Sequence, residues 1–171
     1  GITGATCARE LLLRAPGRVQ LTLFDQGRGL GGRTGHRRVE QNGGYVLPTS
    51  SDAAFAFDHG CQFFRADSET FRNELLKDWL SESWAAEWTG NFGTLGDHGD
   101  FFGFPAQPPF YCGLGGMSAL PCGLLADVEK RGGLVRAGVR VAATRRLTSG
   151  KWLLSGTEGQ AAFHDTAEEE V

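Results

Sequence analysis

The sequence predicts an α/β protein: a parallel sheet with helices and a β-hairpin, interrupted by an inserted α+β portion. A helical apolar pattern near the N-terminus is followed by a strand, as in the second half of a βαβ unit. A second helix precedes a hairpin near the C-terminus. Between them, residues 21–38 form a strand that ends on Asp25 and continues into a run of glycines and arginines.

The first helix covers about residues 1–15. Pro16 and Gly17 end it, and residues 19–24 follow as a strand. We expect the first strand of this βαβ unit to precede Gly1, so the chain is interpreted as a truncated fragment. The apolar positions at helical spacing are Ile2, Ala5, Ala8, Leu12 and Ala15.

Gly1 and Gly4 have the spacing of the last two glycines of a G-x-G-x-x-G motif. In that motif an acid about 20 residues further on binds ribose hydroxyls, and Asp25 lies at this distance. The alternative is an ordinary helix with small residues in its first turn. Four glycines and the arginines Arg28 and Arg33 follow Asp25 and suit a phosphate, so the stretch favours dinucleotide binding. On this interpretation Asp25 has no role in the core.

The charge is distributed unevenly along the chain. The formal net charge is −3, but residues 1–38 contain seven arginines and two acids, and the remainder is strongly acidic. This pattern favours a local anion site over an extended nucleic-acid surface, so no nucleic-acid partner is expected. No apolar run approaches the roughly 18 residues that a membrane span needs.

The four cysteines predict neither a metal site nor a disulfide framework. No pair has C-x-x-C spacing, and no histidine lies at a zinc-finger interval. Buried thiols in an intracellular reducing compartment, cytoplasm or organelle, are the favoured interpretation. The cysteines are Cys7, Cys61, Cys112 and Cys122.

Residues 39–56 are predicted to form a loop with one short strand near 45–47, and residues 57–64 a strand end or a tight turn. One interpretation places the backbone of Gly60 and the side chains of His59 and Gln62 against a flat ligand. The other makes His59 an ordinary packed histidine and the phenylalanines plain core. For His59 alone, this second interpretation is favoured.

A helix is predicted over residues 68–84, with Ser68 as its N-cap. Residues 93–109 are predicted to form a long loop or a strand pair. The phenylalanines in this stretch could serve in a substrate lid or pack under a loop, and the sequence favours neither role. The apolar face of the helix is Phe71, Leu75, Leu76, Trp79 and Leu80.

The C-terminal third begins with a second glycine cluster. Ser118 is predicted to N-cap a helix that reaches Lys130 and ends at Gly132 and Gly133. Two strands, 134–146 and 151–155, are then predicted to form a hairpin about Ser149 and Gly150.

Four segments, in this order, resemble a known family: DQGRGLGGR (25–33), FDHGCQFF (57–64), WTG (88–90) and GMSAL (116–120). They resemble FAD-dependent amine oxidases and, more narrowly, the renalase-like branch of the NAD(P)/FAD-dependent oxidoreductases. The resemblance extends from Gly1 to about Phe163. It implies a Rossmann-like FAD/NAD(P)-binding domain. Compared with that family, this chain would lack the first strand and the C-terminal half.

The resemblance also implies roles for single residues. Gly1 and Gly4 face the FAD pyrophosphate, Asp25 binds the adenosine ribose, and Val141 pairs through its backbone with the adenine. The familiar acid is more often Glu than Asp, and Cys61 stands where relatives often have Ala. The implied cofactor-binding residues are Gly1, Gly4, Asp25, Gln26, Arg28, Gly31, Gly32, Arg33, Gly60, Gln62 and Val141.

The implied function is hydride transfer from an amine or a reduced dinucleotide-type small molecule to flavin N5, with reoxidation by oxygen. The FAD-binding domain would comprise residues 1–56 and 113–171, and residues 57–112 would be a substrate-domain portion. No catalytic residue is assigned; His59 and Gln62 are the ring-facing candidates, and the fragment alone is expected to be inactive. The alternative functions are a non-catalytic dinucleotide-binding or sensor module and, less favoured, an enzyme that uses NAD(P) alone.

Overall fold

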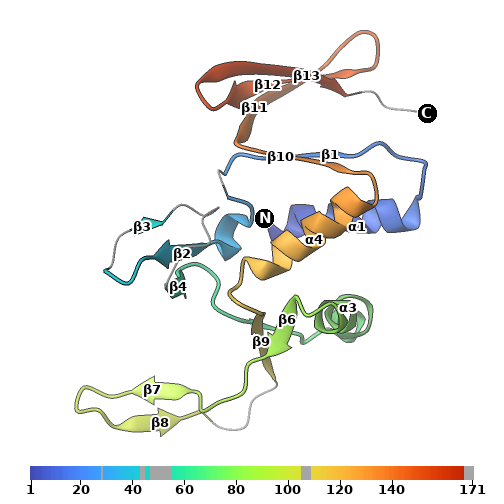
Figure 1. The fold of residues 1–171 in the computed structure, drawn as a ribbon. Helices are drawn as coiled ribbons and strands as arrows, with labels where there is room; N and C mark the ends of the chain where they lie inside the picture. The colour runs from blue at the N-terminus through green and yellow to red at the C-terminus, as the bar shows by residue number, and fades with distance from the viewer. Residues whose placement is uncertain (28, 43–44, 47–54, 105–108, 168–171) are drawn as a thin grey trace.

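A computed structural model describes residues 1–27, 29–42, 45–46, 55–104 and 109–167. A short parallel strand pair lies between two helices on one side and an antiparallel meander on the other (Figure 1). The pair is β1 (Thr22–Asp25) and β10 (Leu134–Ala137); the helices are α1 (Ile2–Arg14) and α4 (Ala119–Lys130); the meander is β11 (Val139–Arg146), β12 (Trp152–Glu158) and β13 (Ala161–Ala167). The fold is therefore mixed α/β with a short parallel sheet, as the sequence predicts.

The parallel pairing runs from Thr22 opposite Leu134 to Asp25 opposite Ala137. The predicted strand over 19–24 is thus confirmed, although it begins at Thr22 and includes Asp25. Within the described residues this sheet has two strands. Both strands reach the same edge of the sheet, so Asp25 lies beside the connection from β10 to β11.

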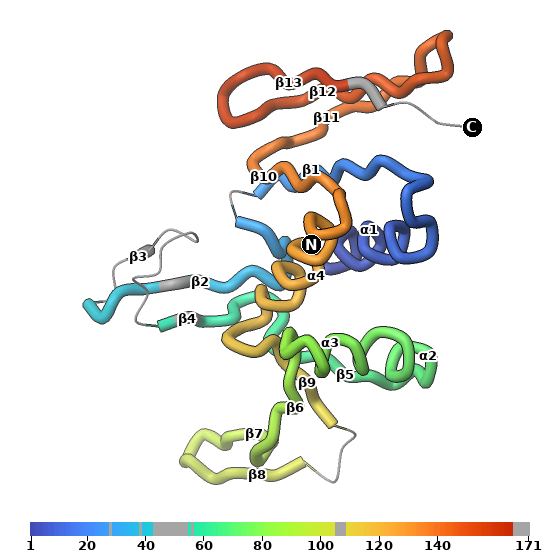
Figure 2. Tube along the Cα trace, turned by 45° about the vertical axis from the view of Figure 1, so that its right-hand side comes forward, coloured from blue at the N-terminus to red at the C-terminus, as the bar shows by residue number. Residues whose placement is uncertain are grey.

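Helices α1 and α4 pack side by side in both views of the chain (Figures 1 and 2). Ala5 and Ala8 of α1 are small and buried, which allows the two helices to approach closely. The end of α4 is as predicted: Gly132 has φ +87°, and its N–H donates to Glu129 while that of Gly133 donates to Val128. The core residues between these elements are Ala5, Ala8, Leu12, Trp79, Ala85, Met117, Leu120, Leu124, Leu125 and Val128.

Arg9 of α1 is a charged residue within this core. Its Nε donates to Asp127 Oδ2 at 2.8 Å, and one terminal nitrogen donates to Asp78 Oδ2 at 3.3 Å. The guanidinium also lies 5.6 Å from the centre of the Trp84 ring. The other terminal nitrogen is 3.5 Å from Glu10 Oε1, within ion-pair distance but without a hydrogen bond among the described residues. Arg9 therefore ties α1 to α4 and to the helix that contains Asp78.

That second helix is continuous from Glu69 to Ser81 but includes a π turn. Its parts are α2 (Glu69–Phe71), the π turn η2 (Arg72–Leu76) and α3 (Lys77–Ser81). Ser68 caps it as predicted, because its Oγ accepts the Phe71 N–H at 3.4 Å. The prediction that it reaches Trp84 is wrong, since Glu82 is the C-cap and Ser83 has φ +57°.

The predicted apolar face of this helix is correct at Trp79, which is buried, but wrong at Leu80, which is 39% exposed. A π turn takes more residues per turn than an α-helix. It therefore changes which side chains after Leu76 face the core.

Residues 57–112 supply a second antiparallel sheet and a hairpin. The sheet has the order β5 (Phe64–Arg65), β9 (Phe110–Gly113), β6 (Ala85–Glu87), and the hairpin pairs β7 (Gly93–Leu95) with β8 (Phe101–Gly103). The hairpin points away from the helices in two views (Figures 1 and 2). Of the long loop and the strand pair that were the alternatives for 93–109, the strand pair is the one seen, within 93–103; residues 105–108 lie outside the described residues. Phe101, Phe102 and Phe104 are each more than half exposed, so packing under a loop does not describe them.

Another sheet follows the glycine–arginine stretch. Its order is β3 (Tyr45–Val46), β2 (His36–Val39), β4 (Phe55–Asp58). The short strand predicted near 45–47 is confirmed at Tyr45–Val46, and Leu47 lies outside the described residues. Strand β2 was not predicted, because it is basic and shows no apolar alternation. Strand β4 ends at Asp58, within the 57–64 segment for which a strand end or a tight turn was predicted.

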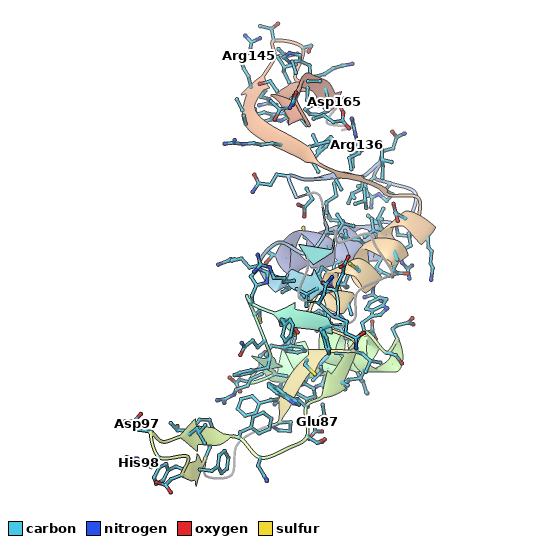
Figure 3. The ribbon with its side chains drawn as sticks, turned by 60° about the vertical axis from the view of Figure 1, so that its left-hand side comes forward. Glu87, Asp97, His98, Arg136, Arg145 and Asp165 are labelled. Atoms are coloured by element: carbon cyan, nitrogen blue, oxygen red, sulfur yellow. The ribbon has the colours of Figure 1, made fainter. Side chains whose placement is uncertain are left out.

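The meander confirms the predicted hairpin and adds to it. Gly150 has φ +86° at its turn, whereas Gly138, with φ +74°, divides the predicted 134–146 strand into β10 and β11. The third strand, β13, was not predicted. Arg136 lies 5.1 Å from the Phe163 ring centre and donates to Glu158 at 2.8 Å. One of its terminal nitrogens lies 3.7 Å from Asp165 Oδ2, and Figure 3 labels both residues. These contacts attach the meander to β10.

Within the described residues, no helix has the length and apolar character required to cross a membrane. In the same residues, no three His, Cys, Asp or Glu side chains are grouped so that they could hold a metal ion.

The first prediction concerns the core between α1 and α4. Leu124 is fully buried, so Leu124→Ala should lower the free energy of unfolding by about 2–5 kcal/mol. Leu114 is 55% exposed, and Leu114→Ala should change it by less than about 0.5 kcal/mol. Urea denaturation of both variants measures the difference, and equal losses would contradict the packing described here.

The second prediction concerns Asp127. Burial raises the pKa of this carboxyl, but hydrogen bonds and charges from Arg131 and Arg9 outweigh burial and hold its pKa below the usual value. Its ion pairs therefore stabilise the fold fully above the unfolded pKa of about 3.9, and this stabilisation is lost as pH falls through the lowered folded pKa. Asp127→Asn should reduce stability near neutral pH, and the difference from wild type should disappear in acid.

Denaturation at a series of pH values tests this expectation. Asp97→Asn, at the exposed tip of the β7–β8 hairpin (Figure 3), is the matched control and should behave as wild type throughout. A loss in Asp127→Asn that is independent of pH would contradict the assigned ion pairs.

Candidate functional site

The structure brings the Asp25 carboxylate to the start of α1. Asp25 Oδ2 lies 3.4 Å from the amino nitrogen of Gly1, and Oδ1 accepts the N–H of Gly27 at 2.8 Å. The side chain is only 10% exposed. Gly1 and Asp25, which are 24 residues apart in the sequence, are thus in contact in the structure. One expectation is corrected: Asp25 also has a structural role, because its Oδ1 holds the turn at Gly27.

The start of α1 is suited to an anion. The first N–H groups of a helix have no intrahelical acceptor, and the helix dipole favours negative charge there. Gly1 is the N-cap and has no side chain to occupy these groups, and the first turn contains no acid. A Cβ at Gly4 would lie at an ordinary 3.8 Å from Leu23, so the described residues do not require glycine there.

The glycine-rich turn folds back against the start of α1. Gly31 and Gly32 have φ +128° and +58°, and η1 (Gly32–Thr34) follows. A Cβ at Gly32 would lie 3.1 Å from the Gly1 Cα, so a side chain there would displace the turn. Thr34 Oγ1 donates to the Gly31 carbonyl at 2.7 Å and stabilises the turn.

The polar residues of this turn lie on its outside. Gln26 and Arg33 are exposed, while Gly31 is buried. Arg28 lies outside the described residues, so its predicted phosphate contact stays a prediction.

Residues beyond β4 lie against the same turn. The Cys61 N–H donates to the Arg33 carbonyl at 3.1 Å, and a Cβ at Gly60 would overlap that carbonyl. Gly60 therefore lies against the glycine–arginine stretch, and its predicted place near a flavin ring stays a prediction. His59 and Gln62 are exposed on either side of this contact, and their roles toward a flavin ring stay predictions.

The meander reaches the site through Gly138, whose N–H donates to the Gly27 carbonyl at 2.9 Å. Val141 is three residues further on, half-buried, and paired with Gly156 beside a β-bulge. The structure thus places the predicted adenine-side strand next to the turn after Asp25. The contact of Val141 with an adenine stays a prediction.

Residues at the start of α4 make contacts that the sequence analysis did not predict. Both Asp58 oxygens accept the N–H of Met117, at 3.0 and 3.1 Å, and Ser118 Oγ lies 2.5 Å from His36 Nδ1. Ser118 is the N-cap residue as predicted, but its side chain makes no capping bond. The signal that could have indicated these residues is the occurrence of Asp58 and Ser118 within the two short motifs FDHG and GMS.

A cavity of about 510 Å³ lies beside α1. It is mostly apolar and is lined by α1, β5 and the 69–81 helix, including Ile2, Cys7, Phe71 and Trp79. None of the predicted cofactor-binding residues lines it, so it is not the site that Asp25 belongs to.

The comparison with known families agrees with this geometry. The family described as "NAD(P)-binding Rossmann-like domain" matches residues 1–79, which include α1, β1, the glycine-rich turn and Gly60. No curated protein matches the sequence. Residues 1–79 thus resemble a dinucleotide-binding domain of the kind found in oxidoreductases, whose fold serves FAD as well as NAD(P).

The third prediction concerns Cys112, which is partly buried near Asp58. Burial and then the negative charge of Asp58 raise the pKa of the Cys112 thiol. The thiolate is the reactive form, so iodoacetamide at pH 8 should modify Cys112 more slowly than the exposed Cys7. Peptide mass spectrometry over a time course measures both rates.

Asp58→Asn removes the charge but not the burial, so it should speed modification of Cys112 while leaving Cys7 unchanged. Equal rates at Cys112 and Cys7 in the wild-type protein would contradict the prediction.

Proposed function

We propose that this chain binds FAD as part of an oxidoreductase similar to the renalase-like branch of the FAD-dependent amine oxidases. The single observation that carries the proposal is the convergence of the Asp25 carboxylate, the start of α1 and the Gly31–Gly32 turn. The match of residues 1–79 to an NAD(P)-binding Rossmann-like domain supports a dinucleotide ligand. The glycine–arginine stretch after Asp25 supports FAD in particular.

The residues present fit the adenosine diphosphate half of such a cofactor. A carboxylate offers about four lone-pair sites, and the bonds from Gly27 and from the Gly1 amino group use one on each oxygen. Asp25 can therefore accept bonds from a ribose diol while it still holds the turn. The free N–H groups at the start of α1 suit the pyrophosphate, and the exposed guanidinium of Arg33 adds positive charge nearby.

Bound FAD would supply the redox chemistry, taking a hydride from an amine or a reduced dinucleotide-type small molecule and passing the electrons to oxygen. The chain's own contribution is to bind and orient. Asp25 and the start of α1 hold the nucleotide half, and Gly60, His59 and Gln62 form the candidate ring-facing segment. No described residue is assigned a proton transfer.

A second candidate function is dinucleotide binding without flavin chemistry, in a sensor module or an enzyme that uses NAD(P) alone. The family match favours this candidate as much as FAD, because its description names NAD(P). An absorbance spectrum of protein purified with FAD and dialysed extensively separates the two. Retained flavin absorbance supports the first, and its absence with retained NADPH binding supports the second.

The fourth prediction is that Asp25→Ala weakens FAD binding by about ten- to a hundredfold. Losing hydrogen bonds to a charged group costs roughly 1.5–3 kcal/mol. Because Ala also removes the bond from Gly27, this variant should melt at a lower temperature as well. Asp25→Asn keeps an acceptor for Gly27 but loses the charge, so it should weaken FAD binding with a smaller effect on melting.

Titration of each folded variant with FAD, beside a melting curve without ligand, measures both effects. Asp97→Asn, at the far hairpin tip (Figure 3), is the control and should keep wild-type affinity. Wild-type affinity in a folded Asp25→Ala protein would remove the main support for the proposal.

A further inference from the structure

Two side chains from neighbouring strands hold the residues that lead into α4. His36 of β2 and Asp58 of β4 lie directly opposite each other in the antiparallel register. Asp58 accepts the Met117 N–H with both oxygens, and His36 Nδ1 shares a hydrogen bond with Ser118 Oγ. Adjacent positions on two strands thus hold consecutive residues, Met117 and Ser118.

The use of Ser118 is unusual for a serine at this position. An N-cap serine ordinarily accepts a hydrogen bond from an N–H of its own helix. Ser118 instead has helical dihedral angles, φ −69° and ψ −15°, and makes no such bond. Its hydroxyl bonds to a histidine 82 residues earlier in the chain. It therefore joins two elements rather than completing one helix.

Gly116 allows this approach. Its φ is +118°, which suits glycine, and a Cβ there would lie 3.3 Å from His36 Nδ1 and 3.7 Å from Asp58 Oδ1. A side chain at residue 116 would crowd His36 Nδ1 and would reach ordinary contact with Asp58. Gly116 thus leaves room for the His36 side chain.

The held helix in turn supports the nucleotide site. Pro121 is in the first turn of α4, and its Cγ would lie 3.6 Å from a Cβ built at Gly31. A Cβ built at Gly32 would lie 3.1 Å from the Gly1 Cα at the start of α1. The Gly31–Gly32 turn therefore lies between the starts of α4 and α1. His36 comes four residues after Gly32, so its bond to Ser118 ties the segment that follows the turn to the helix on which the turn rests.

We propose that His36 and Ser118, together with Asp58, are positioning residues that set the affinity of the site for a dinucleotide. Their bonds hold the Gly31–Gly32 turn between the two helix starts in the arrangement that receives the ligand. This inference rests on the proposed function, because it concerns the same site.

The experiment compares Ser118→Ala, His36→Leu and the double variant, using FAD as the probe. Ser118→Ala should weaken FAD binding by about three- to tenfold, the effect of one lost hydrogen bond, and His36→Leu should weaken it at least as much. The double variant should be no weaker than the weaker single one, because both remove the same bond. Ser118→Thr keeps the hydroxyl and should bind FAD more tightly than Ser118→Ala.

Ser81→Ala is the matched control. It also removes one serine hydroxyl bond, to the Asp78 carbonyl at 2.9 Å, but at the end of α3. It should keep wild-type FAD affinity. Melting curves without ligand for all variants show whether an effect on affinity goes beyond an effect on folding.

Several outcomes would overturn the inference. Wild-type FAD affinity in Ser118→Ala, with only a lower melting temperature, would reduce the His36–Ser118 bond to a structural contact. Additive losses in the double variant, or no gain in Ser118→Thr, would also contradict it. If Asp25→Ala loses affinity while Ser118→Ala does not, this inference fails and the proposed function stands. If the wild-type protein binds neither FAD nor NADPH, the proposed function fails and this inference with it.

Discussion

The packing of α1 against α4 and the 69–81 helix depends on the buried guanidinium of Arg9. It bonds to Asp127 of α4 and Asp78 of α3, so it joins residues from the three portions into which the chain was predicted to divide. A buried charge is strongly destabilising when a partner is removed, which restricts how α1 and the two other helices can sit. Because the starts of α1 and α4 border the Gly31–Gly32 turn, the same restriction fixes the frame of the candidate site.

The features that the sequence predicted correctly depend on local rules. Helix α4 has an apolar face and ends at Gly132 and Gly133, whose backbone bonds are those of a glycine-terminated helix. The proximity of Gly1 and Asp25 also followed from the sequence. A helix, a short turn and a strand bring the chain back to its starting edge, so spacing along the chain becomes proximity in space.

The features that the sequence could not predict depend on distant partners. Strand β2 is basic and forms because β3 and β4 flank it, and β13 forms because β12 offers an edge. From its place before a helix, the Ser118 hydroxyl was predicted to cap that helix. Its actual partner, His36, lies 82 residues earlier and could not be identified from the neighbouring sequence. The buried position of Arg9 is of the same kind, since its carboxylate partners come from two other regions. Local sequence patterns do not predict contacts between residues that are far apart in the sequence.

The candidate site is held in place by the protein itself. The bond from Gly27 fixes one oxygen of Asp25, and Thr34 fixes the carbonyl of Gly31. On the opposite side, His36 and Asp58 fix the approach to α4. Groups that are already ordered lose less conformational freedom when a ligand binds, so on the proposed function each of these bonds would favour affinity without touching the ligand. On the proposed function, a dinucleotide would bind the Asp25 carboxylate and the start of α1 where these bonds already hold them.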